Sequence, residues 1–265
     1  QVGEVKHHFQ KFEEIEKRKE AILASIHEQG KLTDELRNDI EQCVDSQQLE
    51  DLYLPYRPKR KTKASIAKAK GLEPLAEDIF NCRVDDPQKC ASRYLNEDVP
   101  NEEEALQGAR DIIAEWISES MEIRSHLRNQ YTKYGKLTAK VARGVDADTD
   151  EALKYKNYFE FSENISRAPS HRVLAILRGA SEGVLSVKID VDSERALDDV
   201  YYGVLKGKKR ATSKVADQIE LAVEDSYKRL LHPSIENESL KIIKERADIE
   251  SIKVFGENLR QLLMA

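Results

Sequence analysis

Apolar side chains recur at helical spacing along most of the chain. Between residues 4 and 29 they follow one another in steps of three, four or seven, which places them on one face of a helix: Val5, Phe9, Phe12, Ile15, Ile22 and Ile26. Gly30 follows, and glycine readily takes the left-handed conformation that ends a helix. The pattern predicts a first helix up to this point and shorter helices from Thr33 and Ser46.

The longest periodic run begins after Asn101, whose side chain can cap a helix. Apolar or small residues then follow in steps of three or four up to Gly135: Ala105, Ala109, Ile112, Trp116, Ser120, Ile123 and Leu127. One continuous helix of about 30 residues would be roughly 45 Å long. We expect it to be a central helix against which the shorter helices pack.

Strict alternation of apolar and polar residues occurs clearly in one segment. Leu185, Val187, Ile189 and Val191 alternate with Ser186, Lys188 and Asp190, as in a half-buried strand. A single strand needs a partner, which either residues 201–205 or another domain of a longer protein could supply. The sequence predicts an all-α fold, an elongated multi-helix scaffold around a long central helix, with at most one small β element near residues 184–205.

Composition agrees with exposed helices. Charged residues make up 35% of the chain and aromatic residues 6%, and the formal net charge is −6. No apolar run approaches the roughly 20 residues that cross a bilayer. Cys43, Cys82 and Cys90 lack metal-ligand spacing and are interpreted as reduced cytosolic thiols. The chain has no catalytic, phosphate-loop or zinc motif, so we predict neither an enzyme nor a cofactor or metal site.

Positive charge is concentrated between Arg57 and Lys70, a segment with seven basic residues and no acid. Prolines 55 and 58 stiffen its approach, and five cations fall within seven positions: Arg57, Lys59, Arg60, Lys61 and Lys63. Such a cluster can bind nucleic-acid phosphates. The alternative is a solvated loop whose charges pair with Glu50, Asp51 or the acidic start of the long helix, and the residues alone leave both readings open.

Two further groups are candidate phosphate ligands. His171 and Arg172 stand at the start of a helix predicted after Pro169, and a helix N-terminus can hold an anion. The alternative is a structural cap that joins this helix to the following strand. A second basic group contains Lys208, Lys209 and Arg210.

Several motifs together resemble the Tex family of transcription-accessory proteins. They are L-E-D-L-Y-L-P-Y-R-P-K-R-K-T-K-A at 49–64, A-L-Q-G-A-R-D-I-I-A-E at 105–115 and P-S-H-R-V-L-A-I-L-R-G at 169–179. They span most of the chain in family order. The resemblance implies a bacterial cytoplasmic protein whose helical N-terminal region precedes an RNase-H-like domain, helix-hairpin-helix elements and an OB-type RNA-binding domain.

On this basis we expect three segments. Residues 1–100 would form a helical bundle with the basic loop, 101–192 the long helix with the helix-strand unit, and 193–265 helices that lead to the RNase-H-like domain. Because the chain starts at Gln1 and ends on an apolar stretch, we expect a fragment of a longer protein. The leading hypothesis is a scaffold of a nucleic-acid-binding transcription protein that contacts RNA or DNA non-specifically, with no membrane partner. The alternative is a protein-interaction platform that docks on the transcription machinery.

Overall fold

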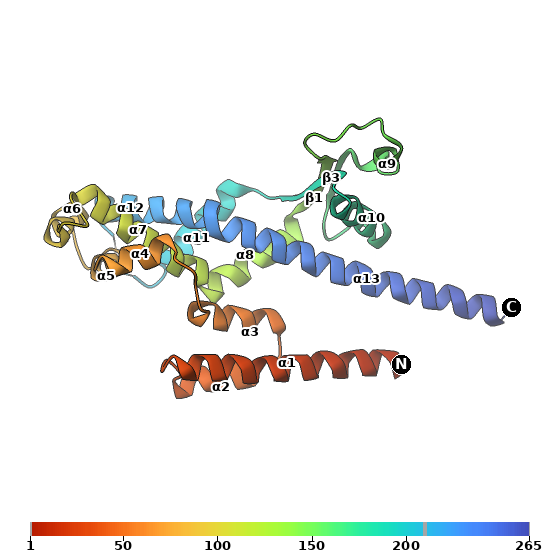
Figure 1. Cartoon of the computed structure of the whole chain (residues 1–265), viewed down its shortest axis with the longest axis horizontal. Helices are drawn as coiled ribbons and strands as arrows, with labels where there is room; N and C mark the ends of the chain where they lie inside the picture. Colours follow the sequence, from red (N-terminus) through yellow and green to blue (C-terminus); the bar gives the residue numbers. More distant parts are fainter. Residues whose placement is uncertain (1, 209–210, 265) are drawn as a thin grey trace. The chain divides into compact units, whose positions relative to one another are not determined.

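The computed structural model describes residues 2–208 and 211–264. The chain is mostly helical and contains a small antiparallel sheet (Figure 1). It divides into two compact units, each made from two stretches of sequence. Unit 1 comprises residues 1–125 and 205–226, and unit 2 comprises residues 126–204 and 227–265.

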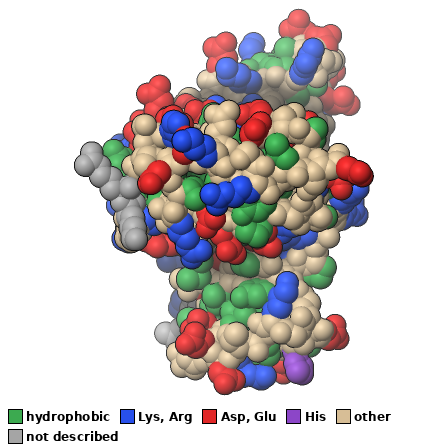
Figure 2. Space-filling view, turned by 90° about the vertical axis from the view of Figure 1, so that its left-hand side faces the viewer, with side chains coloured by type: hydrophobic (Ala, Val, Ile, Leu, Met, Phe, Trp, Pro, Cys, Tyr) green, Lys and Arg blue, Asp and Glu red, His purple; other side chains and the backbone are tan. Residues whose placement is uncertain are grey.

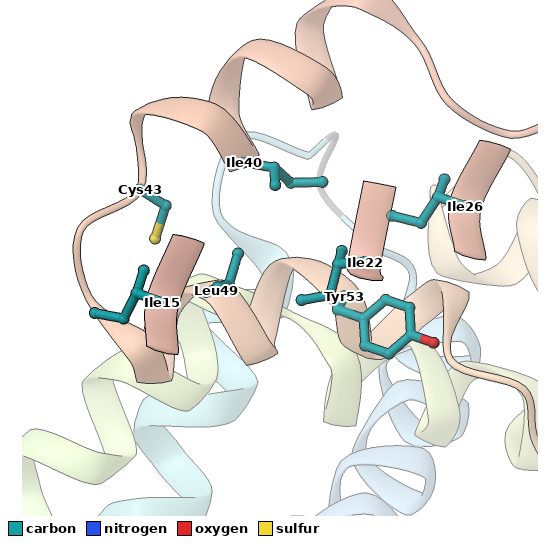
Figure 3. Packing of buried hydrophobic residues seen from close by; sticks show 7 residues of the cluster. All are labelled: Ile15, Ile22, Ile26, Ile40, Cys43, Leu49 and Tyr53. Carbon is teal, nitrogen blue, oxygen red and sulfur yellow. The ribbon is translucent and has the colours of Figure 1, made fainter. Parts of the chain in front are cut away.

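The first three helices of unit 1 form as their sequence signals predict. They are α1 (Val2–Glu28), α2 (Asp34–Gln42) and α3 (Ser46–Tyr53). Gly30 has φ +67° after α1, and the Thr33 hydroxyl accepts a hydrogen bond from the Leu36 N–H at 3.2 Å. Their apolar faces share one core (Figure 3), formed by Ile15, Ile22, Ile26, Ile40, Cys43, Leu49 and Tyr53.

The rest of unit 1 is arranged around α7 (Glu102–Glu119), which Asn101 caps as predicted by accepting a bond from the Glu104 N–H. Four shorter helices pack against it (Figure 1): α4 (Lys63–Ala69), α5 (Glu73–Phe80), α6 (Pro87–Ala91) and α12 (Ser213–Asp225). Gly108 permits the close approach, because a Cβ there would lie 2.3 Å from Leu72 Cδ1.

The prediction of one uninterrupted helix from Asn101 to Gly135 was wrong. The backbone of Ser120 is extended, with φ −66° and ψ 115°, and separates α7 from α8 (Met121–Tyr134). The Ser120 hydroxyl accepts a hydrogen bond from the Ile123 N–H at 3.4 Å, and its carbonyl accepts one from the Arg124 N–H at 2.9 Å. Serine therefore starts a new helix here, since its side chain competes with helix continuation.

Unit 2 contains a three-stranded antiparallel sheet in the order β2-β1-β3. Its strands are β1 (Lys136–Val141), β2 (Glu160–Asn164) and β3 (Leu185–Asp190). The partner of the predicted strand is thus β1, and the sheet extends beyond residues 184–205. Residues 201–205 belong to α11 (Ser193–Leu205), so the first proposed partner was wrong. The alternation in β1 is weaker because its two inward residues are Leu137 and the small Ala139.

The predicted register of β3 is confirmed. Leu185 and Ile189 are buried and Val187 is half-buried, whereas Ser186 and Lys188 are exposed. Opposite them, Leu137 pairs with Ile189 and Ala139 with Val187. Val191 lies just beyond the end of the strand and is half-buried.

The helix α10 (Ser170–Ser181) packs against both β3 and α13 (His232–Met264) (Figure 1). With 33 residues, α13 is the longest helix in the described part of the chain, and it continues through Gly256. The helix α12 is capped by Thr212, one residue before the predicted Ser213. The remaining short elements are η1 (Leu54–Tyr56), η2 (Ser92–Tyr94), α9 (Asp150–Leu153), η3 (Lys156–Tyr158) and the π-helical η4 (Ser226–Leu231).

Candidate nucleic-acid interface

The predicted basic cluster lies in a short loop of unit 1. Its approach is a 3-10 turn, η1, that contains Pro55, and Arg57 then adopts an extended conformation. At the other end Thr62 caps α4: its hydroxyl accepts a bond from the Ser65 N–H at 3.0 Å, and the Ser65 hydroxyl accepts one from the Thr62 N–H at 2.8 Å. Ordered turns therefore hold both ends of the loop.

Four of the five cations present their charge to solvent. Arg57, Arg60, Lys61 and Lys63 are exposed, and within the described part of the chain no carboxylate lies within ion-pair distance of any of them. We call these four residues the cationic quartet. An exposed cation without an acidic partner is available to an external anion.

Lys59 has a different environment. Its Nζ lies 3.0 Å from Oε1 of Glu115 and also bonds a carboxylate oxygen of Glu119. The side chains of the two acids are only 13% and 12% exposed, and that of Lys59 is 28% exposed. Burial opposes the charge of Lys59, but the hydrogen bonds to Glu119 and Glu115 outweigh it and raise its pKa. Burial raises the pKa of the Glu119 carboxyl, against the opposing effect of Lys59.

The acids expected as intramolecular partners of the basic loop bind elsewhere. Asp51 accepts a hydrogen bond from Arg124 at 3.0 Å, and Glu50 accepts one from Arg18 at 2.6 Å. Glu103, at the start of α7, pairs with Arg110. Glu115 and Glu119 lie near the opposite end of that helix. In the sequence the only signal for these two acids is their separation by one helical turn.

The structure gives His171 and Arg172 a position at the start of α10 in unit 2. Both side chains are exposed, and Arg172 donates to Glu163 at 3.3 Å. The neighbouring Ser170 hydroxyl donates to a carboxylate oxygen of Glu250. A carboxylate thus already lies at this helix N-terminus, where a phosphate would have to bind.

Lys208 lies in unit 1 and contacts Phe80. Its Nζ donates to the Phe80 carbonyl oxygen at 2.7 Å and lies 3.1 Å from the centroid of the Phe80 ring. Burial lowers the pKa of Lys208 to about 8, and proximity to Cys82 acts in the opposite direction. The ammonium is therefore engaged inside the fold. Lys209 and Arg210 lie outside the described residues.

The chain matches known proteins over most of its length. A family model described as Tex central region-like matches residues 83–255, more than half of the chain. The chain belongs to the Tex family. It is homologous to the N-terminal third of Tex proteins.

Individual relatives match all or nearly all of the chain. The transcriptional accessory protein Tex of Neisseria gonorrhoeae is 37% identical over 267 residues, which is 100% of this chain and 35% of that protein. An uncharacterized Bacillus subtilis protein, YdcI, is 43% identical over 100% of this chain and 36% of its own length. The human S1 RNA-binding domain-containing protein 1 is 27% identical over 98% of this chain and 27% of its length. The chain thus spans about a third of the length of its bacterial relatives.

The surface of this Tex-family chain carries both signs of charge. Figure 2 shows a face on which Lys and Arg side chains are interspersed with Asp and Glu side chains, without one continuous basic area. Among the described residues, no helix is long and apolar enough to span a bilayer. No group of three His, Cys, Asp or Glu residues in the described ranges could hold a metal ion. The cationic quartet is therefore the strongest candidate site.

Proposed function

We propose that the cationic quartet makes weak, non-specific phosphate contacts within a cytoplasmic Tex-family protein that binds nucleic acid during transcription. The observation that carries this proposal is the set of four exposed cations that have no carboxylate partner among the described residues, in a chain whose net charge is −6. The role is one of binding, with no catalytic step and no cofactor. The proposal also keeps the expected division of the chain into three segments, residues 1–100, 101–192 and 193–265.

Family membership supports a nucleic-acid ligand. One relative is named a transcriptional accessory protein, and another is named for an S1 RNA-binding domain. Because this chain covers about a third of its bacterial relatives, we expect other parts of such proteins to contribute most of the affinity. The quartet would add an electrostatic contribution that does not depend on sequence.

The physical basis is counterion release. Each phosphate that a Lys or Arg neutralises frees condensed ions, so the logarithm of the binding constant falls by about 0.9 per contact for each unit of log salt on duplex DNA. Non-specific binding of this kind has dissociation constants of about 10⁻⁴ to 10⁻⁶ M at physiological salt. The isolated chain should bind at the weak end of this range.

The test compares two triple variants with equal loss of charge. R60A/K61A/K63A removes three members of the quartet, and K17A/K31A/R37A removes three exposed cations elsewhere in unit 1. Binding to an RNA and a duplex DNA of unrelated sequences is measured at several salt concentrations. The quartet variant should weaken binding to both and reduce the salt slope by up to about 2.7. The control should change affinity less than about twofold, since long-range charge effects are screened.

Equal losses in the two variants, or unchanged binding of the quartet variant across the salt range, would reject the quartet as a phosphate site. Unchanged binding together with weaker capture of RNA polymerase by the quartet variant would favour the interaction-platform hypothesis.

A further inference from the structure

We infer that Lys59 is a positioning residue. Its contacts with Glu115 and Glu119 attach the basic loop to α7, so that the cationic quartet faces solvent. The effect on nucleic-acid binding rests on the proposed function above. The attachment of the loop to α7 by Lys59 is a property of the fold and can be tested separately.

Lys59 differs from the neighbouring cations in its contacts. Glu115 and Glu119 are one turn apart on α7, and both carboxylates meet the same ammonium, which is 3.0 Å from Oε1 of Glu115. An ammonium has three donors and can serve both acids. The two carboxylates are largely buried and Lys59 is partly buried, so these contacts are better shielded from solvent and salt than exposed ion pairs.

Glu115 also holds the far end of the loop. Its Oε1 accepts from Lys59, while its Oε2 accepts a hydrogen bond from the Thr62 hydroxyl at 3.1 Å. Thr62 is in turn the cap of α4. Arg60 and Lys61 are therefore confined between two points fixed on one carboxylate, and Lys63 follows directly in the first turn of the helix.

The attachment of the loop by Lys59 should increase the affinity for nucleic acid, because an unattached loop must be ordered when its cations bind phosphates. Ordering one backbone residue costs free energy equivalent to about a tenfold change in affinity. Loss of Lys59 would also leave two neighbouring carboxylates without their shared cation, close to the phosphate ligands. A fifth phosphate ligand would behave differently, because its removal would lower the salt slope and leave the loop ordered.

The experiment compares K59M with K63M, each of which removes one positive charge. Binding of a generic single-stranded RNA is measured over a salt series. Hydrogen exchange is measured without RNA at the amides of Thr62, Ser65 and Ile66, which donate hydrogen bonds where the loop meets α4. K63M should lower the salt slope by about 0.7, the value for one contact on a single strand, with unchanged exchange. K59M should weaken binding by about tenfold, change the slope by less than half that amount, and accelerate exchange.

Two more variants complete the test. E115Q should accelerate exchange in the loop while all five cations remain. K59R should restore both slow exchange and affinity, since a guanidinium can bridge two carboxylates. If K59M lowers the salt slope as much as K63M and leaves exchange unchanged, Lys59 is a fifth phosphate ligand and the inference is wrong. If none of the quartet variants affects RNA binding, the proposed function fails. The exchange data on K59M and E115Q still decide whether Lys59 attaches the loop to α7.

Discussion

Arg124 and Asp51 form a buried ion pair within unit 1. The Nε of Arg124 lies 3.0 Å from Oδ1 of Asp51, and the two side chains are 5% and 2% exposed. Arg124 also donates to the Ser118 carbonyl oxygen at 3.0 Å. The pair joins α3 to the first turn of α8, directly after the break at Ser120. Removing either partner would leave a charge buried inside the fold.

Asp51→Ala should therefore lower the free energy of unfolding by about 3–5 kcal/mol, as found when one member of a buried pair is removed. The adjacent Glu50 offers a matched control, because its pair with Arg18 has side chains 38% and 43% exposed. Glu50→Ala should cost less than about 1 kcal/mol. Urea denaturation of both variants measures the difference. Similar losses would show that the burial of the Arg124–Asp51 pair has no energetic weight.

Gly108→Ala should destabilise unit 1. The added Cβ would lie 2.3 Å from Leu72 Cδ1 and 3.3 Å from the Cβ of Ala67, and Leu72 is itself buried. Overpacking of this kind costs about 1–3 kcal/mol. In contrast, a Cβ added at Gly256 inside α13 would have no described atom from another part of the fold within 4 Å. Gly256→Ala should therefore stabilise by about 0.5–1 kcal/mol. Thermal melts compare the two, and a stabilising Gly108→Ala would contradict the close packing.

The register of β3 can be tested with one residue type at two neighbouring positions. Ile189→Thr places a hydroxyl on the buried face and should cost roughly 1–3 kcal/mol. Lys188→Thr lies on the exposed face and should change stability by less than about 0.5 kcal/mol. Both variants introduce threonine, which favours strands, so β-propensity does not explain a difference in their stability. Denaturation midpoints for the pair measure it, and the reverse order would contradict the register.

Lys208 should make stability depend on pH in alkaline solution. Its pKa is about 8 in the folded chain, because of burial, against an ordinary value of 10.5. Between these values the unfolded state binds more protons, so the contribution of Lys208 to the free energy of unfolding rises as pH increases from about 8 to about 10. In Lys208→Met this rise should be lost, while Cys82, whose pKa burial raises, titrates in both proteins. Urea denaturation at pH 7.5, 8.5 and 9.5 measures the difference, and parallel pH profiles would contradict the burial of the ammonium.

Short-range signals in the sequence determined several helix starts and the face of β3. The caps Thr33 and Asn101 bond backbone groups three residues away. These interactions depend on neighbouring residues and can be read locally. The density of positive charge around Arg60 was equally plain. Motifs in family order were sufficient to indicate the Tex family, which the match over residues 83–255 shows.

Only the tertiary structure decided which residues far apart in sequence contact one another. The periodicity from Asn101 to Gly135 continues through Ser120, yet the helix stops there, and the buried Arg124 that follows pairs with Asp51, 73 residues away. The strand partner β1 lies 50 residues from β3 and carries only a weak alternation. Lys59 looks like its neighbours in the sequence, but it meets carboxylates 56 and 60 residues away. Such choices depend on which surfaces pack together, and local residue preferences do not contain that information.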